Sequence, residues 1–217
     1  MRAALCITVI AVFCGILAGQ SEPQSSSRSH HSASRTAEAP SIEDGIYRNP
    51  SFHFSYKIPF GWVVRTEAMQ PDAANTEDAS SGQVLLAVFE HPPEVSGSTI
   101  NASVVIATES LAAYQGSKTA IDYLGVVNNL VTAQGFTAAR DPQDLTLDGK
   151  SLVRGDFSKP RGSLTMHQST LVMLQKGRFL SFTFVAGSDD DVDELIGGLS
   201  FATSRKPASS SPPKAPN

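Results

Sequence analysis

A β-hairpin pattern occupies residues 164–185, which read LTMHQSTLVMLQKGRFLSFTFV. Apolar, β-branched and aromatic residues fill both halves, and Lys176-Gly177 lies between them, where a tight turn is expected. Phe179, Phe182 and Phe184 make the second half especially bulky. We therefore predict two long antiparallel strands, over 164–174 and 178–185, at the centre of a sheet.

Further strands are predicted before this hairpin. Asp148-Gly149, a strong signal for a two-residue hairpin turn, separates short stretches at 145–147 and 151–153. Apolar and polar residues alternate over 52–58, as in a strand with one buried face, until Pro59-Phe60-Gly61-Trp62 ends the pattern. The remaining strands are predicted at 45–49, 62–64, 84–89 and 102–107.

Two helices complete the predicted domain. The first runs from about Thr119 to Gln134, where Thr119 and Asp122 form a capping box and Gly135 follows as a stop. The second begins after Ser188 and has a narrow apolar stripe at Val192, Leu195, Ile196 and Leu199. Strands and helices do not alternate regularly, which indicates an α+β domain built on a largely antiparallel β-sheet with helices packed on both faces.

The chain divides into four predicted segments. Residues 1–20 have the pattern of a signal peptide, in which Arg2 precedes an uncharged, mostly apolar run that ends in small residues. Residues 21–40 and 204–217 are poor in apolar residues, so we predict a disordered linker and a disordered Pro/Ser tail. The folded domain is assigned to 41–203.

We expect the protein to be exported to the periplasm, the cell envelope or the medium. A helix over residues 3–19 would span roughly 25 Å, which is short of the roughly 30 Å hydrocarbon core, so cleavage after Ala18 or Gln20 is favoured. An uncleaved anchor is the alternative. Both cysteines, Cys6 and Cys14, lie in this segment, so the cleaved form has no disulfide and no thiolate nucleophile.

The charge of the domain restricts its partners. Residues 41–203 contain 19 acidic and 11 basic residues, a formal charge of −8. A domain this acidic, without a basic cluster, is a poor candidate for binding nucleic acid or anionic lipid surfaces. We therefore expect a protein partner or a small-molecule or lipid ligand, and membrane contact only if the N-terminal segment is retained.

The sequence contains no convincing catalytic, cofactor or metal motif. It lacks a Gly-x-Ser-x-Gly elbow, a His-Glu-x-x-His pair and a Gly-rich phosphate loop. Asp189, Asp191 and Asp193 fit the first turn of a helix better than a calcium loop, because the loop's glycine and bidentate glutamate are missing. We predict no catalytic, cofactor-binding or metal-binding residue. The alternative, a hydrolase, depends on His53 or His167 lying beside a carboxylate.

Phe60, Trp62 and Tyr114 are the candidate ligand-binding or partner-binding residues, because they lie in or near predicted turns and could line a groove. The alternative is that they cap the ends of the core, since aromatic side chains dominate core burial. The long polar stretch at 66–83 is a further place for partner contact, with a loop of no binding role as its alternative.

The domain resembles the PsbP-like α/β/α sandwich family over roughly residues 45–201. The resemblance rests on Pro59-Phe60-Gly61-Trp62 after an aromatic strand, the helix around 120–124, the Asp148-Gly149 turn, and the 179–184 strand before a helix ending in Leu199-Ser200-Phe201. The family includes extrinsic subunits of photosystem II, a eukaryotic Ran-binding protein and many exported bacterial proteins. The resemblance implies an α/β/α sandwich and an accessory or binding role, and it implies no site residue.

Three functional hypotheses follow. The favoured one is an exported, non-enzymatic binding or accessory protein of the cell envelope or periplasm that needs no cofactor. The second is a hydrolase with an unrecognised polar site. The third is a membrane-tethered structural protein, which requires that the N-terminal helix is retained and that residues 21–40 form a stalk.

Overall fold

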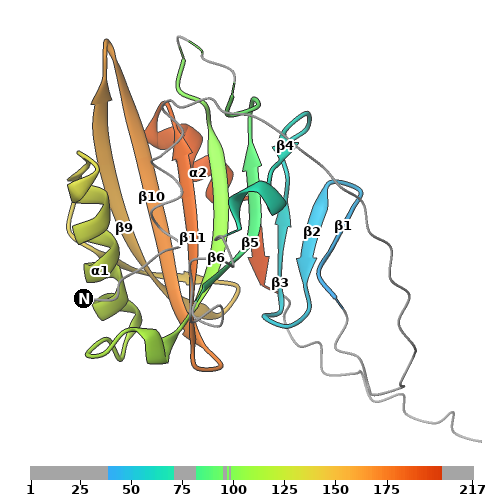
Figure 1. Ribbon diagram of the computed structural model, residues 1–217, viewed down its shortest axis with the longest axis vertical. Helices are drawn as coiled ribbons and strands as arrows, with labels where there is room; N and C mark the ends of the chain where they lie inside the picture. Colours follow the sequence, from blue (N-terminus) through green and yellow to red (C-terminus); the bar gives the residue numbers. More distant parts are fainter. Residues whose placement is uncertain (1–38, 71–81, 95–96, 98, 202–217) are drawn as a thin grey trace, which may run out of the picture.

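The computed structural model describes residues 39–70, 82–94, 97 and 99–201, and Figure 1 shows their arrangement. The predicted signal peptide, the predicted tail and nearly all of the predicted linker lie outside the described residues. In the stretch predicted as a loop at 66–83, a short 3-10 helix covers Glu67–Met69, and residues 71–81 again lie outside the described part.

A large antiparallel sheet forms the centre of the molecule. Its strand order is β4-β5-β6-β11-β10-β9-β7, and β8 pairs with β9 beside this path. The bounds are β4 Val63–Val64, β5 Gly82–Phe89, β6 Ser103–Ser110, β7 Thr137–Ala138, β8 Gln143–Leu147, β9 Lys150–Arg161, β10 Leu164–Gln175 and β11 Arg178–Ala186. The strands predicted at 84–89 and 102–107 are present, and each extends beyond the predicted bounds.

The two hairpins predicted from their glycines are confirmed. Lys176 and Gly177 have φ values of 53° and 69°, and Gln175 pairs with Arg178 across the turn. The Asp148-Gly149 turn has φ values of 49° and 75°. Positive φ at both central residues defines the type I′ turn, whose twist matches that of the flanking strands.

A smaller sheet has the strand order β1-β2-β3-β12, with β1 Ser41–Glu43, β2 Ile46–Asn49, β3 Phe54–Lys57 and β12 Leu199–Phe201. Strand β1 was not predicted, although Asp44-Gly45 forms a third turn with two positive φ values, 52° and 72°. Strand β3 is shorter than the predicted 52–58 strand, because the backbone of His53 has a φ of 56° and is not extended.

Helix α1 spans Ala120–Ala133, and its predicted capping box is confirmed, with both halves present between Thr119 and Asp122. Helix α2 spans Asp189–Ile196, and the Ser188 side chain caps it by accepting from the backbone N–H of Asp191. The prediction that Leu199 extends the apolar stripe of this helix is wrong, because Gly197 and Gly198 end the helix and Leu199 begins β12. Among the described residues, no helix is both long and apolar enough to cross a membrane.

The large sheet is buried on both faces. On one face, the small sheet and α2 cover it, and their main core includes an edge-on contact between Phe54 and Phe182 with ring centroids 5.2 Å apart. On the other face, α1 covers it, and Tyr123 stacks on Phe179 with centroids 4.4 Å apart. The fold is therefore α+β, a mostly antiparallel sheet with helices packed on it, as the sequence predicts.

Gly198 offers a test of the contact between the two layers of the main core. Its backbone carbonyl accepts from the N–H of Lys57 at 2.9 Å, and an added Cβ would lie 3.0 Å from both the Lys57 carbonyl oxygen and the buried ring of Tyr56. We expect Gly198→Ala to lower the free energy of unfolding by about 1–3 kcal/mol, because neither neighbour can withdraw easily. Urea denaturation followed by Trp62 fluorescence measures this change.

Gly125 provides the matched control, because it lies exposed on α1 with no atom within 4 Å of an added Cβ. Gly125→Ala should raise the free energy of unfolding by roughly 0.5–1 kcal/mol, since alanine favours a helix interior over glycine. Equal and small effects at both glycines would contradict the close approach at Gly198.

Candidate functional site

The site begins with a tight turn at residues 59–62. The backbone N–H of Trp62 donates to the Pro59 carbonyl at 3.3 Å, and Gly61 has a φ of 83°. Positive φ at the third residue is the signature of a type II turn, which favours glycine at that position. Phe60 consequently occupies the second position at the tip of the turn, and its side chain is fully exposed, at 106% of its reference area.

Both ends of this turn are fixed to the folded core. On its N-terminal side, the N–H of Ile58 donates to the Gly45 carbonyl at 2.8 Å, next to the bond between Lys57 and Gly198. On its C-terminal side, Trp62 packs against the main core and leads directly into β4. The exposed ring of Phe60 is therefore presented by a rigid support.

An open groove of about 1630 Å³ surrounds the turn. Its walls come from the β1–β2 hairpin, β4, the connection between β5 and β6, the tip of the β9–β10 hairpin and α2. Of the six large apolar side chains that are exposed in the described part of the chain, four line this groove: Ile42, Phe60, Val64 and Leu164. Exposed apolar area concentrated in one place is typical of interaction sites.

A second hollow adjoins the groove. It has a volume of about 540 Å³, lies between β1–β2 and β4–β5, and shares Ile42 and Val64 with the groove. Its lining adds Arg65 and Glu67, one charge of each sign. The apolar surface therefore continues beyond the turn along the edge of both sheets.

The charged side chains that line the groove are mostly acidic. Asp44, Glu90, Asp191 and Glu194 face two basic side chains, those of Lys57 and His91. Glu90 is close to His91, with 3.8 Å between carboxylate oxygen and ring nitrogen, and Asp191 accepts from the Ser188 hydroxyl at 2.6 Å. In the described residues, Asp44 and Glu194 have no cationic partner.

The structure places two of the three candidate residues together. Phe60 and Trp62 both line the groove. Tyr114 lies on the α1 face, where its ring meets Tyr123 edge-on at a centroid distance of 5.0 Å and Phe179 at 6.1 Å. Tyr114 therefore caps the second core, which was the alternative given for these aromatic residues, and it is not part of the groove.

Sequence reasoning missed Ile42, Asp44, Val64 and Leu164 as groove residues. Ile42 and Asp44 belong to the β1–β2 hairpin, whereas Val64 lies in β4 and Leu164 in β10, so no local pattern links the three places. One signal was available for the first two residues, because Asp44-Gly45 is the same hairpin dipeptide as Asp148-Gly149. A hairpin at Asp44-Gly45 turns β1 back alongside β2 and places Ile42 beside the groove.

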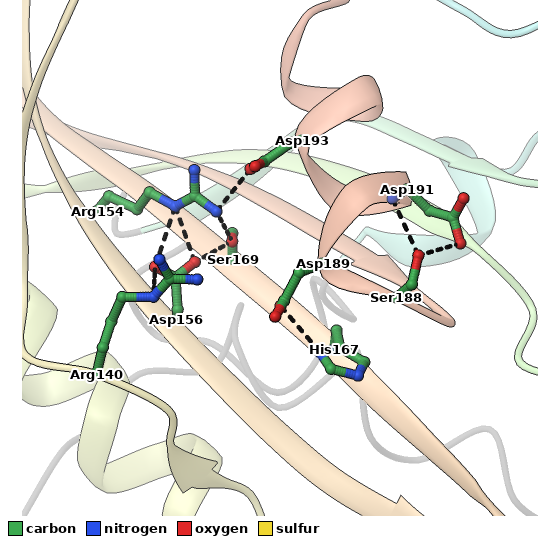
Figure 2. A network of polar contacts seen from close by, with 9 residues as sticks. All are labelled: Arg140, Arg154, Asp156, His167, Ser169, Ser188, Asp189, Asp191 and Asp193. Atoms are coloured by element: carbon green, nitrogen blue, oxygen red, sulfur yellow. Dashed lines mark hydrogen bonds and ion pairs between the residues drawn. The ribbon is translucent and has the colours of Figure 1, made fainter.

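A network of charged groups fixes α2 to the large sheet (Figure 2). Asp156 is only 3% exposed and lies between Arg154, at 2.8 Å, and Arg140, at 3.1 Å, and it also accepts from the Ser169 hydroxyl. The other side of the Arg154 guanidinium meets Asp193 of α2 at 2.8 Å. Two arginines and two aspartates balance in charge, and the pair between Arg154 and Asp193 joins α2, which lines the groove, to β9 of the large sheet.

His167 is the one predicted histidine that lies beside a carboxylate in the described part of the chain. Its Nδ1 atom is 2.9 Å from Asp189 at the start of α2 (Figure 2). No hydroxyl group among the described residues is hydrogen-bonded to His167. His53 and His167 lie near opposite ends of β10. The carbonyl of Ser51, two residues before His53, accepts from Lys176 just after the end of β10. His167 precedes Lys176 by nine residues, which is about 30 Å of extended strand. No three His, Cys, Asp or Glu side chains of the described residues lie close enough together to hold a metal ion.

Burial raises the pKa values of three ionisable groups, Tyr47, Tyr56 and Glu109. Burial raises the pKa of Tyr56, whose hydroxyl donates to the Leu195 carbonyl at 3.2 Å beneath the groove. On the α1 face, burial raises the pKa of Glu109 to about 7, although a hydrogen bond from Tyr123 and the charge of Arg178 act in the opposite direction. Glu109 is 3% exposed and does not line the groove.

The chain matches no protein-family model and no curated protein. Its fold is similar to that of several solved structures. Cyanobacterial PsbP (CyanoP) from Synechocystis sp. PCC 6803 has 15% identity and a TM-score of 0.47, over 72% of this chain and 91% of that one. LpqN, involved in cell envelope biogenesis of Mycobacterium tuberculosis, has 14% identity and a TM-score of 0.39, over 69% and 83%.

A third similar structure is PA94 from Pseudomonas aeruginosa, a protein of unknown function, with 20% identity and a TM-score of 0.36 over 58% of this chain and 80% of that one. At these identities the likeness concerns the fold alone.

The buried carboxyl of Glu109 predicts a pH dependence of stability. Its folded pKa of about 7 lies above 4.5, the ordinary pKa of a glutamate carboxyl, so the folded protein binds more protons between these values and becomes less stable as the pH rises through them. We expect Glu109→Gln to remove this loss, which amounts to at most about 3 kcal/mol. Urea denaturation at several pH values measures it, and parallel curves for the wild type and the variant would contradict the assignment.

Proposed function

We propose that this protein is an exported, non-enzymatic binding or accessory protein of the cell envelope or periplasm, and that the groove around Phe60 is its partner-binding surface. One observation carries the proposal: a large aromatic side chain is held fully exposed on a hydrogen-bonded turn, inside a groove lined by four of the six exposed large apolar side chains of the described residues. Aromatic side chains in such positions are frequent anchors of protein interfaces.

The polar groups outside the groove support a binding role over catalysis. Arg154, Asp156 and Asp193 satisfy one another, and the capping groups of α2 are engaged with its first turn. A nucleophilic enzyme needs an activated hydroxyl or thiol beside its general base. His167 has a carboxylate neighbour but no hydroxyl partner in the described chain.

The PsbP-like assignment is part of the same proposal. It rests on the motifs that define the resemblance, among them the turn at residues 59–62 and the Asp148-Gly149 hairpin, which both form tight turns in this chain. An accessory role would agree with the tendency of that family, although a fold does not fix a function.

Site-specific photo-crosslinking tests the binding surface. Benzoylphenylalanine replaces Phe60 in one variant and, as the matched control, Ile121 in another, because Ile121 is exposed on α1 away from the groove. Irradiation of cells of the native host should yield a discrete crosslinked species from position 60 only. Equal products from both positions, or none from position 60, would count against the groove as the binding surface.

Export is tested by the mass of the protein isolated from the native host. We expect the mature N-terminus at Gly19 or Ser21, because the apolar segment before it is short for a membrane span and ends in small residues. An intact N-terminus in the membrane fraction would instead support the membrane-tethered structural protein.

A hydrolase is the second candidate, and the 2.9 Å contact between His167 and Asp189 is the observation that favours it. Hydrolysis of fluorogenic esters or amides by the wild type, lost in His167→Gln, would support this candidate. Rates equal to those of the buffer, or unchanged in the variant, would remove it.

A further inference from the structure

We propose that the groove binds a basic segment of a partner protein in which Lys or Arg residues flank an apolar side chain. This inference rests on the proposed binding role and adds the chemistry of the partner. The groove combines an apolar floor with an acidic rim, and each feature limits what can occupy it.

The size of the groove favours a polypeptide. Sites for small molecules usually enclose about 300–1,000 Å³ and surround most of the ligand. This groove, at about 1630 Å³, is larger and open, and its apolar surface continues past Ile42 and Val64 into the adjoining hollow. An extended peptide could lie along both hollows, with its apolar side chains against Phe60 and Val64.

The acidic side chains that line the groove favour a partner segment with a positive charge. Four carboxylates face the groove against one lysine and one histidine, and Asp44 and Glu194 are unpaired in the described part of the chain. These two come from different elements of the lining, since Asp44 lies in the β1–β2 turn and Glu194 on α2. Basic side chains could therefore meet a carboxylate from either element, and an arginine or lysine could also lie over the exposed ring of Phe60.

The same charges disfavour a membrane as the occupant. An exposed aromatic side chain at the tip of a turn can insert into a lipid interface, but stable attachment to anionic membranes uses clustered basic residues. Lys57 is the only lysine or arginine that lines the groove among the described residues, and the domain carries a net charge of −8. Repulsion from an anionic surface would oppose insertion of Phe60.

Binding of three fluorescein-labelled synthetic peptides to the full mature chain tests the inference. The first peptide alternates Lys or Arg with Leu and Phe, the second replaces every basic residue with Glu, and the third replaces every apolar residue with Ser. Fluorescence anisotropy should give an affinity for the first peptide at least about tenfold above that for either analogue. Raising the salt from about 0.05 M to about 0.5 M should weaken this binding.

Variants of the groove locate the binding. Phe60→Ser should weaken binding of the basic peptide by about tenfold, as expected for an interface anchor. Asp44→Asn combined with Glu194→Gln should weaken it by about two- to fivefold, because each exposed charge contributes little alone. Asparagine retains the preference for the turn at Asp44-Gly45, so this change leaves the hairpin intact.

The control variants are Ile121→Ser for the apolar change and Asp141→Asn with Asp144→Asn for the charge change. All three residues are exposed, and none lines the groove. These variants should bind the basic peptide as the wild type does. Thermal denaturation of every variant verifies that folding is retained.

The outcomes separate the inference from the proposed function. Equal or tighter binding of the acidic peptide, or binding unaffected by Phe60→Ser, overturns the inference. If position 60 crosslinks a partner in cells but the basic peptide does not bind, the inference fails and the binding role stands. If neither crosslink nor peptide binding is observed, both fail.

Discussion

Burial of the β10–β11 hairpin on both faces is the constraint on which the rest of the structure depends. Phe182 of β11 faces the small sheet through Phe54, and Phe179 faces α1 through Tyr123. Because side chains alternate along a strand, a slip of one residue would exchange these two sets and separate both layers from their partners. The type I′ turn at Lys176-Gly177 fixes the register of β10 against β11, and α1 and the small sheet can then pack only in one arrangement.

The elements that line the groove are held in place by contacts that depend on this hairpin. Strand β11 ends at Ala186 and leads into α2. Asp193 ties this helix to Arg154 on β9, and the Tyr56 hydroxyl donates to the Leu195 carbonyl near the C-terminal end of the same helix. The turn at residues 59–62 is fixed to the small sheet by the two bonds just before it, from Ile58 to Gly45 and from Lys57 to Gly198. A partner would thus meet a surface that is already formed, which reduces the entropy lost on binding.

Local signals predicted most local parts of this fold, apart from the Asp44-Gly45 hairpin, and the other misses were non-local. The capping box of α1 and the turns at Asp148-Gly149 and Lys176-Gly177 involve residues within a few positions of one another, so the sequence displays them directly. Leu199 satisfies the helical spacing of α2, but it pairs with Tyr56 in the small sheet, a contact between distant parts of the chain that no periodicity reveals. The groove was predicted in part for the same reason. Phe60 and Trp62 could be identified from the sequence as aromatic residues in a turn, whereas Ile42 and Leu164 come close to them only in the folded chain.

The exposed Phe60 is difficult to explain by folding alone. Burying a phenylalanine side chain stabilises a protein by roughly 1.5–3 kcal/mol, and this ring gains none of it, whereas Trp62, two residues later, packs against the core. The second position of a type II turn accepts most residues, so the backbone does not require an aromatic side chain there. Apolar surface of this kind would also promote association between copies of the chain, but acidic side chains surround it and a formal charge of −8 opposes contact between like molecules. The acidic rim therefore acts in two ways, since it discourages self-association and leaves the apolar groove available to a partner of opposite charge.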